Sequence, residues 1–262
     1  MRHNQSEGDR VEVVASIEWR RHFWERRGRA ALIPWDTGRS MIEAERDAVA
    51  GSIAEFELGE RSEGRNLMRF ARQHAAATGD EAYVPAMGLF IAEENRHAAM
   101  LARLMKVEGM GLKEKTATDG VFRWLRRLAG LELSIMVLVT AEIIAQVYYR
   151  ALRDATGSAV LRAICRQILE DEDHHIRFQC ERLAILRSRR SRVTVWRRRV
   201  CHRVLMGLTI AVVWKNHGKA LRAGGYTLGR FRRHVAVKLE RAMGIADPRG
   251  YLWPAWEAAR VA

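Results

Sequence analysis

Two copies of the pattern Glu-x-x-His lie in apolar, helix-forming stretches of the chain. The first is Glu94 with His97, and the second is Glu172 with His175. On an α-helix, residues three apart lie about 60° apart round the axis and roughly 4.5 Å apart along it, so the carboxylate and the imidazole can face one metal ion. One such pair is weak evidence in a chain with 29% charged residues. Two pairs, each in an apolar stretch, indicate a metal site.

Two further glutamates are predicted from the geometry of antiparallel helix hairpins, in which residues at equal distances from the turn lie beside each other. Two residues lie at the same depth only when the turn falls near their midpoint in the sequence. For Glu142 and Glu172 the midpoint is Gly157, and for Glu60 and Glu94 it falls beside a Thr-Gly-Asp turn. The sequence therefore predicts one glutamate from each of two helices and one Glu-x-x-His from each of the other two.

Several other acids and one histidine lie at or near the same depth. Glu57, Glu60 and Glu63 lie on the same side of the first helix. Their midpoints with Glu94 all fall near the turn, so the midpoints do not distinguish the three glutamates. Glu132 fails the test, since its midpoint would fall inside a helix. Asp171 with His174 has the same i,i+3 spacing as the chosen pair and is a second choice, because aspartate is shorter and the midpoint fits less well.

Four carboxylates and two imidazoles make the ligand set of a dinuclear carboxylate site in a helix bundle. Hard oxygen ligands with nitrogen suit Fe or Mn better than a closed structural zinc site. Asp171 lies four residues before His175, and Glu93 lies four before His97. We expect each of these acids to accept the remaining ring N–H of the histidine on the facing helix. Bound cations would also explain how four acids can be buried together.

The pattern along the chain predicts an all-α protein. Residues 1–12 are expected to lack structure, 112–130 form a long connection, and 131–149 is apolar enough to raise a membrane-spanning alternative, although its two glutamates favour a buried helix. We expect an N-terminal tail and short helix over 1–39, a metal-binding bundle over 40–190, and a helical extension over 191–262 that packs on the bundle. The predicted helices cover 16–29, 40–77, 81–107, 131–155, 158–189, 191–223 and 228–243.

Composition sets further limits on the class of protein. The 262 residues carry a formal net charge of +14, mostly from arginine, and the three cysteines form no Cys-x-x-Cys pair. Reduced thiols and a polar N-terminus without a secretion signal predict a cytoplasmic protein without a transmembrane span. The arginine-rich run 187–203 fits either contact with phosphates or an acidic partner, or a solvated helix end.

These motifs resemble the ferritin-like di-iron carboxylate superfamily, which includes rubrerythrins, di-iron oxygenases, ribonucleotide reductase small chains and ferritins. The resemblance covers about residues 40–190. It implies a ferritin-like four-helix bundle with a long connection between its second and third helices, two bound Fe ions (or Fe with Mn), and Glu60 rather than its neighbours as the first-helix ligand. The implied ligands are Glu60, Glu94, His97, Glu142, Glu172 and His175.

The expected function is an O₂-dependent di-iron oxidase or oxygenase that acts on a mostly apolar small molecule. The expected apolar lining is Leu138, Val139, Ile143, Gln146, Ile168 and Ile176. No rubredoxin-like module is present, so electrons are expected from a separate ferredoxin or reductase, and the apolar segment 204–214 covers the bundle or forms a homodimer contact. The alternatives are iron oxidation or peroxide removal, as in ferritins and rubrerythrins, and a tRNA-modifying hydroxylase that would bind nucleic acid.

Overall fold

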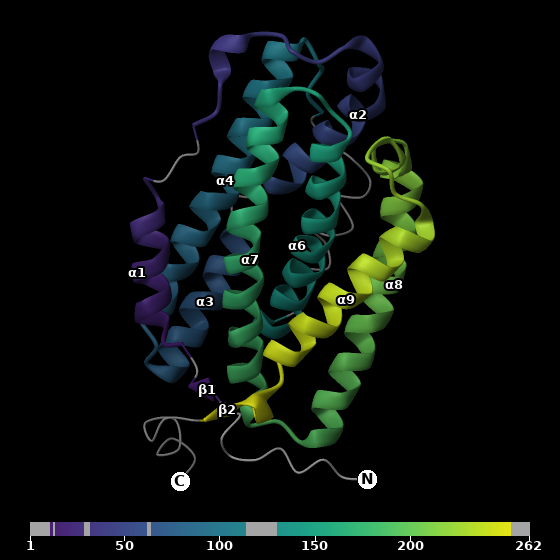
Figure 1. The fold of residues 1–262 in the computed structure, drawn as a ribbon. Helices are drawn as coiled ribbons and strands as arrows, with labels where there is room; N and C mark the ends of the chain where they lie inside the picture. The colour runs from purple at the N-terminus through teal and green to yellow at the C-terminus, as the bar shows by residue number, and fades with distance from the viewer. Residues whose placement is uncertain (1–10, 13, 29–31, 62–63, 114–129, 253–262) are drawn as a thin grey trace.

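The protein is described by a computed structural model that covers residues 11–12, 14–28, 32–61, 64–113 and 130–252. Within these residues the fold is all-helical, apart from one short pairing of two strands (Figure 1). The helices are α1 (Ser16–Arg26), α2 (Glu43–Glu60), α3 (Arg65–Thr78), α4 (Tyr83–Glu108), α6 (Leu131–Asp154), α7 (Ala159–Ser188), α8 (Arg192–Ala223) and α9 (Leu228–Ile245). Two short 3₁₀ turns, η2 (Trp35–Thr37) and η3 (Pro248–Gly250), complete the helical elements.

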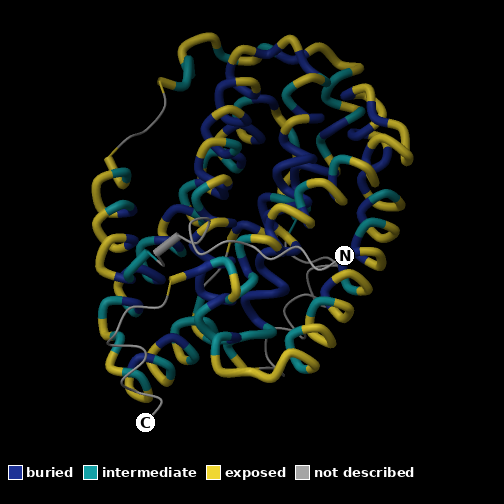
Figure 2. The backbone as a smooth tube through the Cα atoms, turned by 60° about the horizontal axis from the view of Figure 1, so that its bottom comes forward, coloured by how far each residue is buried: buried dark blue, intermediate teal, exposed yellow. Residues whose placement is uncertain are grey.

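The centre of the protein is a helical bundle built around the long, closely packed pair α6 and α7. Helix α4 contacts α7, and α2 and α3 contact α4. Helix α1 covers α4 on one outer side, and α8 and α9 cover α6 on the other (Figure 1). Buried residues are concentrated in the middle of the bundle, above all along α6, whereas α8 and α9 carry many exposed residues (Figure 2).

Helix α6 is the most apolar helix and lies in the main core. By length and composition it could cross a membrane, but 83% of its most apolar window is buried inside the protein. Its Ile135, Val139 and Ile143 are fully buried and pack in one cluster with residues of α2, α4, α7, α8 and α9. This burial supports the prediction of a core helix rather than a membrane span.

Several helix ends occur where the sequence predicts them. The side chain of Ser158 accepts a hydrogen bond from the Leu161 N–H at the start of α7, and Ser191 accepts one from Thr194 at the start of α8. Gly79 adopts a left-handed conformation after α3, which glycine tolerates without steric cost. These caps fix the short turns that bring α7 alongside α6 and α4 alongside α3.

The single helix predicted over 40–77 is wrong, because the structure has two helices there. Helix α2 ends at Glu60, and α3 begins after Gly64, whose φ of 60° is left-handed. A side chain at this glycine would also collide with Ile91 of α4. The break therefore lets the start of α3 approach α4 closely, and it leaves Glu60 in the last turn of α2.

Other expectations need correction or fall outside the described residues. Residues 11–12 were expected to lack structure, but β1 (Val11–Glu12) pairs in parallel with β2 (Tyr251–Leu252). A two-residue backbone pairing has no periodicity by which a sequence could reveal it. The connection predicted over 112–130 lies outside the described residues between 114 and 129, as do residues 1–10 of the predicted tail.

Candidate metal centre

The structure brings together all six side chains that the motifs and the family resemblance imply. They come from the four helices α2, α4, α6 and α7 and form two groups that share one glutamate. In each group, potential ligand atoms lie within 4.8 Å of one another. The first group is Glu60, Glu94, His97 and Glu172, and the second is Glu142, Glu172 and His175.

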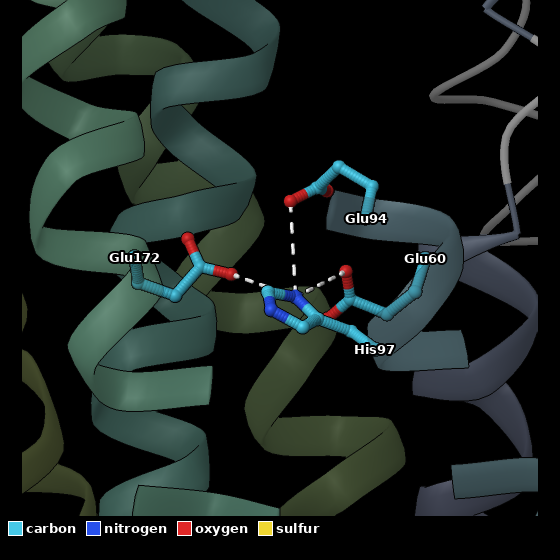
Figure 3. Close-up of side chains that lie close together, drawn as sticks. All are labelled: Glu60, Glu94, His97 and Glu172. Atoms are coloured by element: carbon cyan, nitrogen blue, oxygen red, sulfur yellow. Dashed lines mark ion pairs between the residues drawn. The ribbon is translucent and has the colours of Figure 1, made fainter. Parts of the chain in front are cut away.

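His97 lies at the middle of the first group (Figure 3). Its Nδ1 atom is 3.9 Å from a carboxylate oxygen of each of Glu60, Glu94 and Glu172. Atoms bound to one ion at about 2.1 Å lie roughly 3 to 4 Å from one another. The spacing in this group is therefore that of ligands around a common ion rather than that of hydrogen-bonded pairs.

His175 has the corresponding position in the second group. Its Nδ1 atom lies 3.0 Å from Glu94 Oε1 and 3.7 Å from Glu172 Oε2. Glu172 belongs to both groups, and Glu94 approaches both histidines. The arrangement is that of two neighbouring sites with carboxylates between them.

Six polar atoms of the cluster are buried without a hydrogen bond of acceptable geometry. Among the described residues, these buried atoms without a partner of acceptable geometry are Glu94 Oε1, His97 Nδ1, both carboxylate oxygens of Glu142, Glu172 Oε2 and His175 Nδ1. Buried polar groups are nearly always paired, because an unpaired one costs about 1–3 kcal/mol. Six such atoms in one place fit a site for metal ions, and the donor set of carboxylate oxygens and imidazole nitrogens fits Fe or Mn.

The outer nitrogens of both histidines are hydrogen-bonded, as the sequence predicts. His97 Nε2 lies 3.1 Å from Asp171 Oδ2, and His175 Nε2 lies 3.0 Å from Glu93 Oε2. Each acid is on the helix opposite its histidine, so α4 and α7 exchange a pair of bonds. When a carboxylate accepts from Nε2–H, Nδ1 is left as the atom that can bind a metal.

Two arginines and one glutamine donate hydrogen bonds to these two acids, and the sequence did not predict these contacts. Arg26 of α1 and Gln167 of α7 both donate to Asp171, each at 2.9 Å. Arg96 donates to Glu93 at 2.9 Å and lies 3.5 Å from Asp171. The spacing of Arg96, three residues after Glu93, was a signal available in the sequence. Arg26 had none, because it belongs to a separate helix far away in the chain.

Tyr149 of α6 also contacts the cluster. It is fully buried, and its hydroxyl donates a hydrogen bond of 2.7 Å to Glu60 Oε1. It lies seven residues after Glu142 on α6, a spacing that places both side chains on one face of the helix. The bond fixes one oxygen of Glu60 and leaves its other oxygen toward His97.

The protonation of the cluster reflects its crowded carboxylates. Burial, followed by the charge of Glu172, raises the pKa of Glu142 well above its usual range, and burial followed by the charge of Glu94 does the same for Glu60. Burial alone would raise the pKa of Glu94. The contact with His175 and its charge outweigh burial, so the pKa of Glu94 is lowered. Although burial opposes it, the neighbouring carboxylates of Glu172, Glu93 and Glu94 raise the pKa of His175 well above its usual range. Positive charge is therefore favoured inside the cluster.

The alternative ligands lie elsewhere or have other partners. Glu57 is bonded to Arg61, and the His174 ring packs against the ring of His22 with centroids 4.4 Å apart. Glu132, which the depth argument rejected, forms an ion pair with Arg187. Glu63 lies outside the described residues.

Comparison of the chain with protein-family models, with curated proteins and with solved structures gave no significant match.

Proposed function

We propose that the protein is a ferritin-like di-iron carboxylate oxidoreductase that uses O₂ to oxidise a mostly apolar small molecule. The observation that carries the proposal is the meeting of four buried or nearly buried carboxylates and two buried imidazoles from four helices, with potential ligand atoms in each group within 4.8 Å of one another. A structural salt-bridge network would pair every polar atom of the cluster. Here His175 Nδ1 lies 3.0 Å from Glu94 Oε1, but both carboxylate oxygens of Glu142 are buried without a hydrogen-bond partner among the described residues, as a site for ions requires. Electrons would come from a separate ferredoxin or reductase.

The residues around the ligands define what the protein itself contributes. Asp171 and Glu93 hold the two imidazoles with Nδ1 directed inward, and Tyr149 orients Glu60. The two Fe(II) ions, once bound, would supply the electrons that activate O₂, and O₂ would be the oxidant of the organic substrate. Because the cluster is buried, the protein excludes water, which strengthens the electrostatic interactions inside it.

The expected lining of the substrate region stays a prediction. Five of its members are apolar and buried, which suits a mostly apolar molecule close to the cluster: Leu138, Val139, Ile143, Ile168 and Ile176. Gln146 is engaged elsewhere, since its amide donates to Asp173 at 2.6 Å and its carbonyl accepts from Lys238.

The function is tested by loading the protein anaerobically with Fe(II) and measuring O₂ consumption on mixing with buffer that contains O₂. We expect rapid O₂ uptake by the wild type, loss of uptake by His175→Ala, and retention by His202→Ala, a matched control that removes another buried histidine. Two bound ions without O₂ uptake would contradict the proposed activity while leaving the metal site intact.

A second readout separates the proposed oxidation of an organic substrate from iron storage. With excess Fe(II), an iron-oxidising protein consumes O₂ continuously and accumulates ferric product. An enzyme that oxidises an organic molecule consumes about one O₂ per dinuclear site until electrons are resupplied. Continuous iron turnover would favour the ferritin-like alternative.

A further inference from the structure

A second cluster of charged side chains lies where α7 ends and α8 begins, at the end of the bundle next to η3 and β2 (Figure 1). A cavity of about 590 Å³ opens there between the last turn of α7, the first turns of α8 and the segment from Asp247 to Tyr251. Its described lining includes one acid, Asp247, and six arginines: Arg187, Arg190, Arg192, Arg199, Arg203 and Arg249.

Arg187 is the buried arginine of this lining, and its hydrogen bonds are incomplete. Its side chain is only 2% exposed, and its Nε donates to Glu132 of α6 at 3.1 Å. Its Nη2 atom is buried and has no hydrogen-bond partner among the described residues. A buried guanidinium N–H without an acceptor is costly, so this atom indicates an acceptor that the described chain does not supply.

The other charges of the cavity leave it strongly cationic. Asp247 is already held by Arg199 at 2.9 Å and Arg249 at 2.6 Å, so two cations neutralise the single acid. Arg203 pairs with Glu240. In the part of the chain that the structure describes, Arg190 and Arg192 have no acidic partner.

Two more features of the same cavity favour a phosphate ester. Arg192 begins the 32-residue helix α8, and the positive end of a helix dipole attracts anions. Trp196, also in the lining, is 64% exposed and offers an indole face on which an aromatic ring can stack. The volume lies within the usual range of about 300–1,000 Å³ for small-molecule sites.

We propose that this cavity binds the phosphate group of a nucleotide-like small molecule, with the phosphate at Arg187, Arg190 and Arg192 and the aromatic ring at Trp196. Arginine is suited to this role because its planar fork can hold two phosphate oxygens at once. The site is separate from the metal centre, since Arg187 lies twelve residues beyond His175 on α7, about 18 Å along the helix.

The proposal is tested by titrating the full-length protein with ADP, adenosine and inorganic pyrophosphate in a calorimeter. We expect ADP and pyrophosphate to bind and adenosine to bind at least about tenfold more weakly than ADP. The variant Arg190→Gln/Arg192→Gln should weaken ADP at least tenfold. The control Arg189→Gln/Arg197→Gln removes two exposed arginines outside the cavity lining and should change ADP affinity less than twofold.

Two further variants test the parts of the site. Arg187→Gln should weaken pyrophosphate about tenfold, with folding checked by circular dichroism, and the exposed Arg190/Arg192 pair carries the test if this buried variant does not fold. Trp196→Ala should weaken ADP several-fold and leave pyrophosphate unchanged.

Several outcomes would overturn the proposal. Equal losses in the cavity pair and the control pair would show that net charge alone attracts anions. Absence of ADP binding at millimolar concentration would contradict it directly. Binding to phosphatidylglycerol vesicles, or to RNA, without ADP binding would assign the arginines to a macromolecular surface instead.

Discussion

Asp171 Oδ2 lies 3.1 Å from Nε2 of His97 on the opposite helix, while Glu93 beside that histidine makes the matching contact with His175. The two contacts form a reciprocal exchange between α4 and α7. Because each imidazole is held at its outer nitrogen, both Nδ1 atoms lie toward the carboxylates of the cluster, with Glu94 Oε1 3.9 Å from His97 Nδ1 and 3.0 Å from His175 Nδ1. The exchange therefore determines both the position and the tautomer of the metal-binding atoms.

Substituting Asp171→Asn tests this exchange. The amide keeps the shape of the side chain but removes the charge that orients His97, so we expect metal affinity to fall about 10- to 100-fold. The measurement is a competition titration with a chelator for Fe(II) or Mn(II). Asp173→Asn is the control, because Asp173 is on the same helix but accepts from Gln146 instead of a histidine. Equal affinities in both variants would show that Asp171 has no role in the site.

The pH dependence of stability tests the burial of His202. Burial, followed by the charges of Arg187 and Arg203, lowers the pKa of His202 to about 4. The unfolded chain has a histidine pKa of about 6.5, so between pH 6.5 and 4 the unfolded state binds the proton first. This stabilisation is complete above about pH 6.5, and about 3 kcal/mol of unfolding free energy is lost as the pH falls to 4.

His202→Gln removes this titration and keeps a donor for Thr140, which lies 3.1 Å from His202 Nε2. Urea unfolding at pH 7, 5.5 and 4.5 should show a shallower loss of stability for this variant than for the wild type. His234→Gln, at a more exposed position on α9, should have a smaller effect. Parallel curves for the wild type and His202→Gln would contradict the prediction.

Gly224, which follows α8, tests the contact between α8 and α6. A side chain at this position would collide with the backbone of Ala151 in α6, so we expect Gly224→Ala to destabilise the fold by about 1–3 kcal/mol. Gly207→Ala, in the interior of α8 with open space around it, should instead stabilise by up to about 1 kcal/mol. Thermal unfolding of the two variants checks the opposite signs.

Much of the candidate site could be predicted from the sequence because helical spacing and hairpin symmetry are local rules. The i,i+3 pairs and the two midpoints select five side chains and leave Glu57, Glu60 and Glu63 open on the first helix, where the resemblance implies Glu60. The structure places Glu60 together with the other five. The acids four residues before each histidine were predicted to reach across to the facing helix, and this prediction is confirmed. Their binding of metal stays a prediction.

The features that the sequence did not reveal depend on long-range packing. The break between α2 and α3 occurs where a left-handed Gly64 lies against Ile91, a contact between separate helices. Arg26 reaches Asp171 from a helix about 145 positions earlier, and no spacing rule connects them. The pairing of β1 with β2 joins segments near opposite ends of the chain.

Metal analysis of the purified protein and two glutamate variants tests the central claim most directly. Glu172 belongs to both ligand groups, whereas Glu57, one turn before Glu60, is bonded to Arg61 and belongs to neither. We predict about two Fe or Mn ions per chain in the wild type and in Glu57→Gln, and fewer than one in Glu172→Gln. A wild type without bound metal, or a Glu172→Gln variant that retains both ions, would contradict the assignment of this cluster as a dinuclear centre.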